Sequence, residues 1–458
     1  MTLSQLSAPP RSAVRSDLSA LRDVLRNPSG FLLTLSQAAG DIAQFSAGPV
    51  RIVSINRADL AQRVLVEQAD AFRKMPAVRV IGALTGNGLL INEDATWRRH
   101  RRLAAPAFQH RRVAAYADTI AALASEAVAG WRVGDVLDVG QAMKTLTLRI
   151  IGLTLFDTDF ALDAAGLSDD IEIALDFINR QSGRISLPIL DRLTPGKVRG
   201  LEAIAKVDHF VRSLIRARRA SPGGHTDLLD MLMGARDADG SGLSDDEVRD
   251  EAITLIVAGH ETVATALTWT FHLLGQHPQA AERLRTEAQV ALEDRLAAFG
   301  DLERLPWALQ VFKESMRLYP AAFVIGREAR QRVDLGEFRI AAGTWVMICP
   351  YTSHRDPRAW ANPLGFDPDR FAPAAERAIP RGAYIPFGAG PRVCIGNQFA
   401  LLEAQIILAT IARQFRLTPV DDRPMGIRPM ITLNPDRPVM MRVEQLARSH
   451  SPRDARGV

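Results

Sequence analysis

The sequence has little of several residues that define whole classes of protein. Only two cysteines, Cys349 and Cys394, occur in 458 residues, which excludes a disulfide framework and a zinc site built from four cysteines. No uncharged apolar run reaches the roughly 18 residues that indicate a membrane span. The N-terminus also lacks the apolar stretch of a secretory signal peptide. We therefore expect a cytoplasmic protein with no membrane span.

Lysine is scarce as well, so arginine carries most of the positive charge. The 56 basic and 52 acidic residues are interspersed and leave a formal net charge of only +4. This balance gives no indication of a nucleic-acid partner. One local exception is a basic cluster over residues 98–102 and 110–112, which contains six arginines and two histidines.

Helical patterns dominate the chain, and strands are few and short. The hydrophobic spacing predicts long helical stretches over residues 111–155, 168–185, 200–220 and 251–275. A hairpin is predicted over 45–55, and strands over 338–340 and 344–349 are predicted to pair with each other through Gly343. No strand–helix alternation indicates a doubly wound sheet. We expect a mainly α fold with minor β, built as one domain over 21–446 between flexible tails at 1–20 and 447–458.

Residues 237–248 resemble a calcium-binding loop only in part. Asp237, Asp239 and Ser241 occupy liganding positions of that loop, but Val248 stands where the essential glutamate belongs. We interpret the segment as a solvated loop. Ser244 then caps the next helix, with Glu247 three residues later completing a capping box.

The stretch 251–275 is apolar on every side, which is typical of a central, buried helix. His260, Glu261 and Thr262 interrupt it directly after Gly259. A buried carboxylate is costly unless it is paired or functional. From the residues alone, a satisfied glutamate at a solvated kink and a functional site are equally good interpretations.

Cys394 lies in a glycine-rich loop that leads into a strong helical pattern. Glycines allow the backbone to approach a bulky group closely, and a helix N-terminus favours a thiolate over a thiol. The simpler alternative is a buried free cysteine in a turn. Cys349 lies in a strand without such surroundings and is predicted to be plain core.

The cysteine loop resembles the haem-binding loop of the cytochrome P450 family at each fixed position of that motif. Other segments resemble further signatures of the family, in the same order along roughly residues 40–445. The matching residues are Phe387, Gly390, Arg392, Cys394 and Gly396 in the loop, Trp97 and Arg101 in a WxxxR helix, Ala258 to Thr262 in the oxygen-activation segment, Glu314 and Arg317 in an ExxR helix, and Phe366 to Phe371 in the meander.

The ExxR pattern occurs twice, since Glu282 and Arg285 have the same spacing as Glu314 and Arg317. Glutamate–arginine pairs three residues apart are common on helix surfaces, and we assign the first copy to that class. By resemblance, the second copy joins Arg370 in a buried charge network with a structural role.

The resemblance implies the P450 fold, with a large helix-rich lobe and a small β-rich lobe around a buried b-type haem. Cys394 would be the axial iron ligand. The propionates would be held by Trp97, Arg101, Arg327 and Arg392. Further cofactor contacts are implied for Ala258, Phe387 and Gly396.

The resemblance also implies a monooxygenase that uses O2 and hydroxylates or epoxidises a lipophilic substrate such as a fatty acid, terpenoid or steroid. Glu261 and Thr262 match the acid–alcohol pair that supplies protons for oxygen cleavage. Electrons would come from NAD(P)H through a ferredoxin or flavodoxin and its reductase, which the basic cluster around Arg98 would attract. Arg79 or Arg184 could anchor a substrate carboxylate.

Two alternatives stay open at this point. A haem-thiolate isomerase, dehydratase or peroxygenase would not need both oxygen and reductant. A non-catalytic haem- or ligand-binding protein would leave Glu261 and Thr262 without a purpose.

Overall fold

The computed structural model describes residues 40–47, 50–160, 166–182, 196–221, 227–237 and 239–445, together with residues 9, 30, 223 and 225. The tails expected at 1–20 and 447–458 therefore lie almost entirely outside the described residues.

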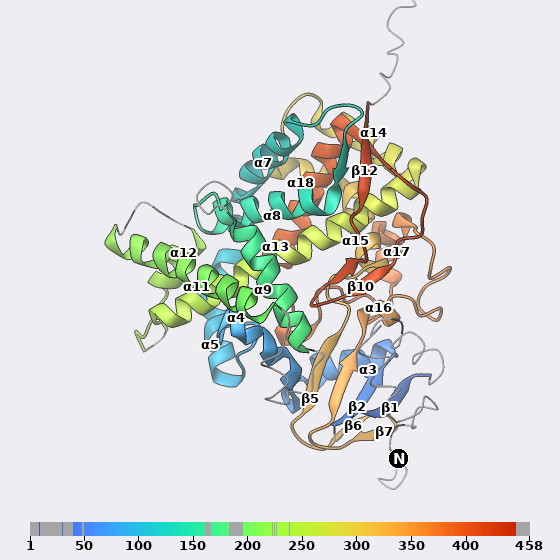
Figure 1. Cartoon of the computed structure of the whole chain (residues 1–458). Helices are drawn as coiled ribbons and strands as arrows, with labels where there is room; N and C mark the ends of the chain where they lie inside the picture. Colours follow the sequence, from blue (N-terminus) through green and yellow to red (C-terminus); the bar gives the residue numbers. More distant parts are fainter. Residues whose placement is uncertain are drawn as a thin grey trace, which may run out of the picture.

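Helices make up most of the described chain, as expected (Figure 1). The α-helices are α3 Ala58–Gln62, α4 Gly82–Thr85, α5 Asp94–Ala104, α6 His110–Ala115, α7 Ala117–Ala129, α8 Val139–Leu155, α9 Leu167–Ser182, α11 Lys197–Ala220, α12 Leu228–Gly234, α13 Asp245–Gln276, α14 Pro278–Leu292, α15 Pro306–Leu318, α16 Pro350–Ser353, α17 Pro373–Ala378 and α18 Asn397–Gln414.

The strands form small sheets, most of them at one end of the molecule (Figure 1). The largest sheet has the order β1-β2-β8-β5-β3, in which only the β2–β8 pair is parallel. The others are β4-β12-β9, β6-β7 and β10-β11. The strands are β1 Ile42–Ala47, β2 Val50–Ile55, β3 Phe72–Lys74, β4 Val136–Asp138, β5 Ile325–Ala329, β6 Val333–Leu335, β7 Phe338–Ile340, β8 Trp345–Ile348, β9 Phe415–Pro419, β10 Ile427–Pro429, β11 Leu433–Pro435 and β12 Met440–Gln445.

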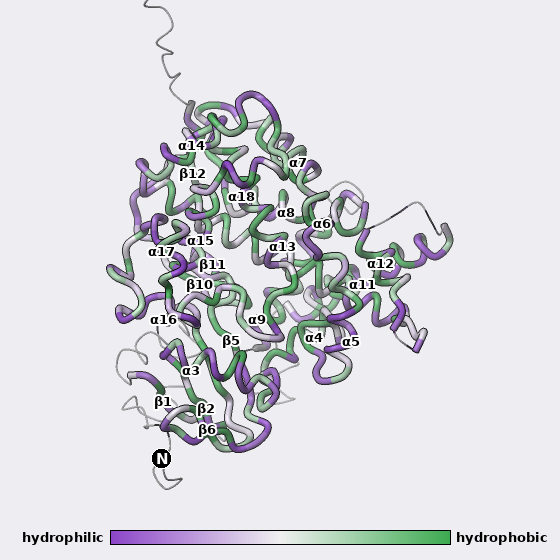
Figure 2. Tube along the Cα trace, turned by 180° about the vertical axis from the view of Figure 1, so that it is seen from behind, coloured by the Kyte–Doolittle hydropathy of each residue, from purple (hydrophilic) through white to green (hydrophobic). Residues whose placement is uncertain are grey.

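α13 is the central helix of the large lobe. It begins at the predicted N-cap, where the Ser244 hydroxyl accepts from the Glu247 amide at 3.2 Å and Glu247 accepts in return from the Ser244 amide at 2.8 Å. Nearly all of its later residues are buried, as the lack of a single apolar stripe predicts. Figure 2 shows hydrophobic residues concentrated in the inner segments of this lobe and hydrophilic ones around the rim.

Separate hydrophobic clusters fill the two lobes. The largest contains residues of α7, α8, α13, α15 and α18. Two smaller clusters lie in the β-rich part, against β1, β2, β5 and β8. Cys349 is fully buried in one of them, which agrees with its interpretation as plain core.

Two sequence-based predictions about local structure are wrong. β7 pairs with β6, whereas β8 lies between β2 and β5, so the strands on either side of Gly343 belong to different sheets. The helical stretch predicted over 111–155 is divided into α6, α7 and α8, with β4 before the last. β8 pairs with the distant β2 and β4 with the distant β12, so in both cases pairing with a remote strand overrides the local pattern. The hairpin predicted over 45–55 is confirmed by β1 and β2.

Candidate active site

The loop before α18 presents Cys394 in the conformation that its glycines predict. Gly388 and Gly390 adopt positive φ angles of 71° and 72°. The Cys394 amide donates to the Phe387 carbonyl at 3.0 Å, which closes the turn. α18 begins three residues later, and its first turn is closed by the bond from the Ala400 amide to the Gly396 carbonyl at 2.9 Å.

The Cys394 thiol lies inside the fold but is not covered. Its side chain retains accessible surface, yet burial raises the pKa of the thiol, while the Gly396 amide and the charge of Arg101 lower it. The sulfur is therefore surrounded closely enough by protein to lose solvation, yet it stays accessible to a ligand. A bound positive ion at the sulfur would remove the cost of ionising this thiol.

One segment of α13 is less covered than the rest of the helix. Ala258 is exposed and Gly259 and Thr262 are half-buried, although their neighbours along the helix are buried. The Thr262 hydroxyl donates to the Ala258 carbonyl at 2.7 Å. The helix continues unbroken through this segment, so these residues mark a local uncovered face of α13.

Glu261 is buried next to this face, and one of its carboxylate oxygens is bound by another element. Its Oε1 accepts from the Thr432 hydroxyl at 2.9 Å and lies 3.4 Å from the Asn434 amide nitrogen. Burial raises the pKa of this carboxyl, and the charge of Lys144 with the two hydrogen bonds acts in the opposite direction. Sequence reasoning missed Thr432 and Asn434, because nothing near them in the chain marks them as partners of residue 261.

Several cations near the cysteine loop have no carboxylate partner. Arg101 and Arg327 make no ion pair within the described residues, and burial lowers the pKa of both, that of Arg327 to about 10. Within the described residues, the Lys74 ammonium donates only to the carbonyls of Leu89 and Asn92, at 2.8 and 2.7 Å. Burial lowers its pKa to about 7. Sequence reasoning missed Lys74, which lies within electrostatic range of Arg327 and Arg392.

Arg392 behaves differently from these cations. It donates to both carboxylate oxygens of Glu93, at 2.8 and 2.5 Å, and its guanidinium lies 5.1 Å from the centre of the Trp97 ring. Burial raises the pKa of Glu93, but bonds from Arg392 and the Lys74 amide outweigh it and lower this pKa. Arg392 thus ties the cysteine loop to the start of α5, where Trp97 and Arg101 also lie.

The second ExxR copy forms the buried network that the resemblance implied. Glu314 and Arg317 are both fully buried and joined by bonds of 2.7 and 2.8 Å. Arg317 also donates to the carbonyls of His354, Pro363 and Gly365. Arg370 lies 3.5 Å from Glu314. In the first copy, on α14, the ion pair joins an exposed Glu282 to a half-buried Arg285.

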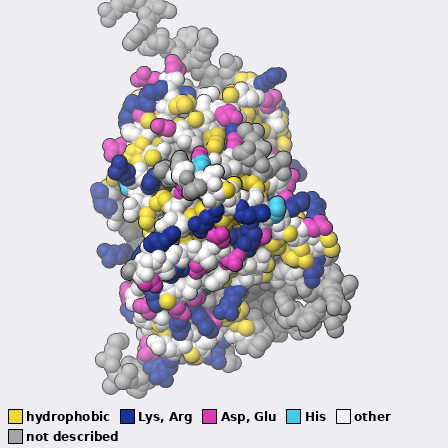
Figure 3. Space-filling view, turned by 90° about the vertical axis from the view of Figure 1, so that its left-hand side faces the viewer, with side chains coloured by type: hydrophobic (Ala, Val, Ile, Leu, Met, Phe, Trp, Pro, Cys, Tyr) yellow, Lys and Arg dark blue, Asp and Glu magenta, His cyan; other side chains and the backbone are white. Residues whose placement is uncertain are grey.

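Part of the basic cluster is already paired within the chain. Arg102 donates to both oxygens of Asp237 at 2.6 and 2.7 Å, and Arg99 donates to Glu247 at 3.1 Å. Asp237, which suggested a calcium loop, is therefore an arginine acceptor. Arg98 and Arg111 remain exposed. Figure 3 shows lysine and arginine side chains in a band across this side of the molecule.

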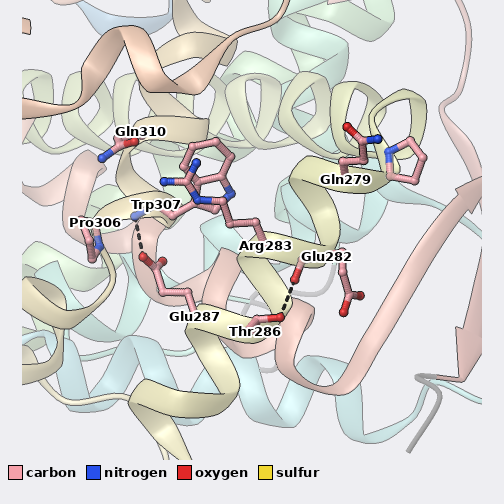
Figure 4. Close-up of a pocket in the computed structure, with 9 residues that line it drawn as sticks. Gln279, Glu282, Arg283, Thr286, Glu287, Pro306, Trp307 and Gln310 are labelled. Carbon is pink, nitrogen blue, oxygen red and sulfur yellow. Dashed lines mark hydrogen bonds between the residues drawn. The ribbon is translucent and has the colours of Figure 1, made fainter. Parts of the chain in front are cut away.

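A surface hollow of about 690 Å³ lies between α14 and α15, away from these residues (Figure 4). In it the Arg283 guanidinium stacks 3.5 Å above the Trp307 ring, and Glu287 accepts from the amides of Trp307 and Ala308. None of the residues predicted for the site is among those that line it. The hollow therefore plays no part in the chemistry considered below.

Comparisons with known proteins agree with this geometry. The family model described as Cytochrome P450 matches residues 20–442. The chain is 36% identical to cyclooctat-9-en-7-ol 5-monooxygenase of Streptomyces melanosporofaciens, over 86% of each chain. It is 32% identical to pentalenene oxygenase of Streptomyces avermitilis, over 93% of this chain and 94% of the relative.

The fold has equally clear counterparts among solved structures. The haem domain of cytochrome P450DA superposes with a TM-score of 0.88 and 26% identity, covering 96% of this chain and 98% of that one. The chain belongs to the cytochrome P450 family. It is a P450 monooxygenase, and the family implies a haem cofactor and the use of O2.

The residues present fit a haem. An accessible thiol at a helix N-terminus suits an iron ligand, and Arg101, Arg327 and Lys74 suit a pair of anionic propionates, since each lacks a carboxylate partner in the described structure. Within the described helices, none is both long and apolar enough to cross a bilayer.

Proposed function

We propose that this P450 hydroxylates or epoxidises a cyclic, terpenoid-like substrate on a haem ligated by Cys394. The observation that carries the proposal is the cysteine loop, in which an accessible thiol lies within electrostatic range of Arg101. Arg101 and Arg327 are both half-buried and make no ion pair within the described residues. Bound haem supplies the cleavage of dioxygen, which a thiolate ligand favours. The protein's own residues hold the group, keep water out and deliver protons.

In this proposal the residues near the propionates differ in how strongly they bind them. Arg101, Arg327 and Trp97 hold the propionates directly. Arg392 reaches the same region but is shared with Glu93, so part of its charge is already compensated. Ala258, Phe387 and Gly396 provide the small or apolar surfaces that contact the rest of the cofactor.

Glu261 and Thr262 act as the acid–alcohol pair. The Thr262 hydroxyl lies on the uncovered face of α13. There it can give up its hydrogen bond to the Ala258 carbonyl and donate to the co-substrate dioxygen instead. Glu261, whose pKa burial raises, holds a proton more readily than an exposed glutamate and can pass it towards Thr262.

The relatives favour one of the expected substrate classes. Their names state oxidation of cyclooctat-9-en-7-ol and of pentalenene. By resemblance to the family, we expect residues 77–90, 177–193, 321–325 and 430–433 to line the substrate pocket. Apolar residues of these segments, such as Phe323, Ile325 and Met430, suit a compact hydrocarbon of that kind. Arg79 is exposed, which weakens its candidacy as a carboxylate anchor, and Arg184 lies outside the described residues, as does much of the segment 177–193.

Electrons are proposed to come from NAD(P)H through a ferredoxin or flavodoxin and its reductase, in the cytoplasm. Arg98 on α5 and Arg111 on α6 support this proposal because both are exposed. Arg99 and Arg102 contribute less, since acidic residues of the chain neutralise them. An acidic carrier would bind such a surface more weakly as salt is added.

The spectrum of the reduced, carbon-monoxide-bound protein tests the core of the proposal. We expect the long-wavelength Soret band of a thiolate-ligated haem, and its loss in Cys394→Ser. An unchanged spectrum in that variant would refute the ligand assignment. Spectral titrations with cyclic terpenoids, fatty acids and steroids then test the substrate class, and tightest binding by a fatty acid would count against terpenoids.

A second variant tests the acid–alcohol pair. Thr262→Ala should bind haem normally but divert reducing equivalents into hydrogen peroxide. Without the Thr262 hydroxyl, protons would no longer be delivered in the way that cleavage of dioxygen requires. Product formation as efficient as in the parent enzyme would refute the role of Thr262.

A further inference from the structure

One face of α13 is fastened to the β10–β11 hairpin. Glu261, Thr265 and Trp269 follow one another at intervals of four residues and therefore share one side of the helix. The Trp269 indole donates to the Leu433 carbonyl at 2.7 Å, and the Thr265 hydroxyl donates to the Asn434 side chain at 3.1 Å. With Glu261 bound to Thr432, the contact extends over two helical turns.

These polar groups form a chain with a direction. The Asn434 side-chain oxygen accepts from Thr265, so its nitrogen is the donor, and it donates to the Thr432 hydroxyl oxygen at 2.8 Å. The Thr432 hydroxyl in turn donates to Glu261 Oε1 at 2.9 Å. Because each group accepts from the one before, every bond strengthens the next. The chain ends on the carboxylate.

The carboxylate oxygens therefore have different surroundings. Oε1 is held by the hairpin, whereas Oε2 makes no hydrogen bond within the described residues. Thr432 is buried, so no bulk water can replace its hydroxyl. Two charged groups act on the pKa of Glu261, Lys144 on α8 and Glu172 on α9. They pair with each other at 2.8 Å. His260 is fully buried, with a pKa lowered to about 3 by burial, and is therefore neutral.

We propose that Thr432, supported by Asn434, is a positioning residue that anchors one oxygen of Glu261 and leaves the other to exchange protons with Thr262. The inference rests on the acid–alcohol role proposed above. A free carboxylate would rotate among orientations, most of which do not face the neighbouring hydroxyl. Thr432 follows Met430 and Ile431 in the turn between β10 and β11, which we expect to line the substrate pocket. A substrate that contacts this turn would therefore act on the proton donor Glu261 through its hydrogen bond to Thr432.

The test compares three single substitutions in the haem-loaded enzyme. Thr432→Val removes the hydroxyl at nearly constant shape, and Thr432→Ser restores it. Thr270→Val is the matched control, because Thr270 is a buried threonine of α13 whose hydroxyl donates only to the Ala266 carbonyl, at 2.7 Å. Each substitution is also made in a Glu261→Gln background.

The first measurement is an infrared pH titration of the ferric enzyme, in which subtraction of the Glu261→Gln spectrum isolates the carboxyl band of Glu261. Losing one hydrogen bond to a carboxylate corresponds to roughly a tenfold change in proton affinity. Thr432→Val should therefore keep Glu261 protonated to higher pH, while Thr432→Ser and Thr270→Val should titrate like the parent enzyme. A titration of Thr432→Val that matches the parent would overturn the proposal.

The second measurement is the share of NADPH electrons that ends as peroxide, with ferredoxin and its reductase as donors and a substrate from the terpenoid screen. Thr432→Val should raise this share, and the rise should vanish in the Glu261→Gln background. An equal rise in both backgrounds would show that Thr432 does not act through Glu261. If Thr262→Ala is fully coupled, the acid–alcohol role itself fails; if it uncouples and Thr432→Val does not, only the positioning role fails.

Discussion

The chain contains two ExxR pairs with the same spacing and opposite surroundings, and this provides an internal test of what burial does to an ion pair. We consider Glu314→Gln and Glu282→Gln, which remove one negative charge each at nearly constant shape. In the first, the new amide nitrogen would face the Arg317 guanidinium, so that two donors meet where an acceptor was. In the second, Arg285 can turn to solvent.

The expected magnitudes follow from the contacts. Glu314 and Arg317 are 0% exposed, and Glu314 also accepts from the Asp367 amide at 2.8 Å. Removing one partner of a buried pair leaves an uncompensated charge, which costs about 3–5 kcal/mol. The Glu282 side chain is 58% exposed, and such a surface pair contributes about 0.2–0.5 kcal/mol. The two variants should therefore differ about tenfold in lost stability.

Urea titration of the haem-loaded variants, followed by far-UV circular dichroism, measures the difference. Glu314→Gln should unfold at a clearly lower urea concentration with an unchanged slope, and Glu282→Gln should overlay the parent curve. Carbon-monoxide spectra of the same samples report haem retention, which should fall with Glu314→Gln only. Equal midpoints for the two variants would refute the reasoning that burial, rather than spacing, decides the contribution of these pairs.

Three further predictions concern buried groups. Glu403 is fully buried, with neither carboxylate oxygen hydrogen-bonded in the described structure, and burial raises its pKa well above the usual value. The unfolded chain then ionises at lower pH than the folded one, so Glu403→Gln should raise the urea midpoint at pH 7 and leave it unchanged near pH 4; equal midpoints at pH 7 would contradict this. His100, although burial opposes its charge, has a pKa raised by bonds to two glutamates. Its contribution is present below pH 6.5 and lost as pH rises through the folded pKa, so the melting-temperature gap between parent and His100→Gln should shrink with rising pH; a constant gap would argue against the pair. Gly390→Ala should lose haem, because the new Cβ would lie 2.0 Å from the backbone oxygen of Leu65. Gly388→Ala has the same φ but meets nothing closer than 3.8 Å, so similar haem contents in the two variants would refute the steric account.

The features that sequence predicted well are those whose cause is local. The glycines around Cys394 and the capping box at Ser244 act within a few residues, and both have the expected geometry. The all-round apolar character of α13 reflects one helix surrounded by others, and its burial follows. The family itself was indicated by its motifs, which include the cysteine loop and the segment 258–262 of α13.

What sequence could not predict are the partners that the fold brings from a distance. Arg102 was expected to face a redox partner, but Asp237, 135 residues away, accepts both of its bonds. Arg392 was expected to hold only a propionate, and Glu93 is its nearest anion. Lys74 escaped notice because a lone lysine after a short strand is unremarkable until its ammonium is buried. Opposite charges scattered along a chain offer many pairings, and only packing selects among them.

The same dependence on distant elements bears on the separate tasks that we propose for Glu261 and Thr262. Adjacent residues of an α-helix point about 100° apart, so two neighbours cannot face the same group directly. Thr262 shares its face with Ala258, four residues earlier, and that face is uncovered. Glu261 shares its face with Thr265 and Trp269, and that face is covered by the β10–β11 hairpin. One helix can therefore present an alcohol to the reaction and hold an acid beside it, provided that a second element fixes the acid from outside.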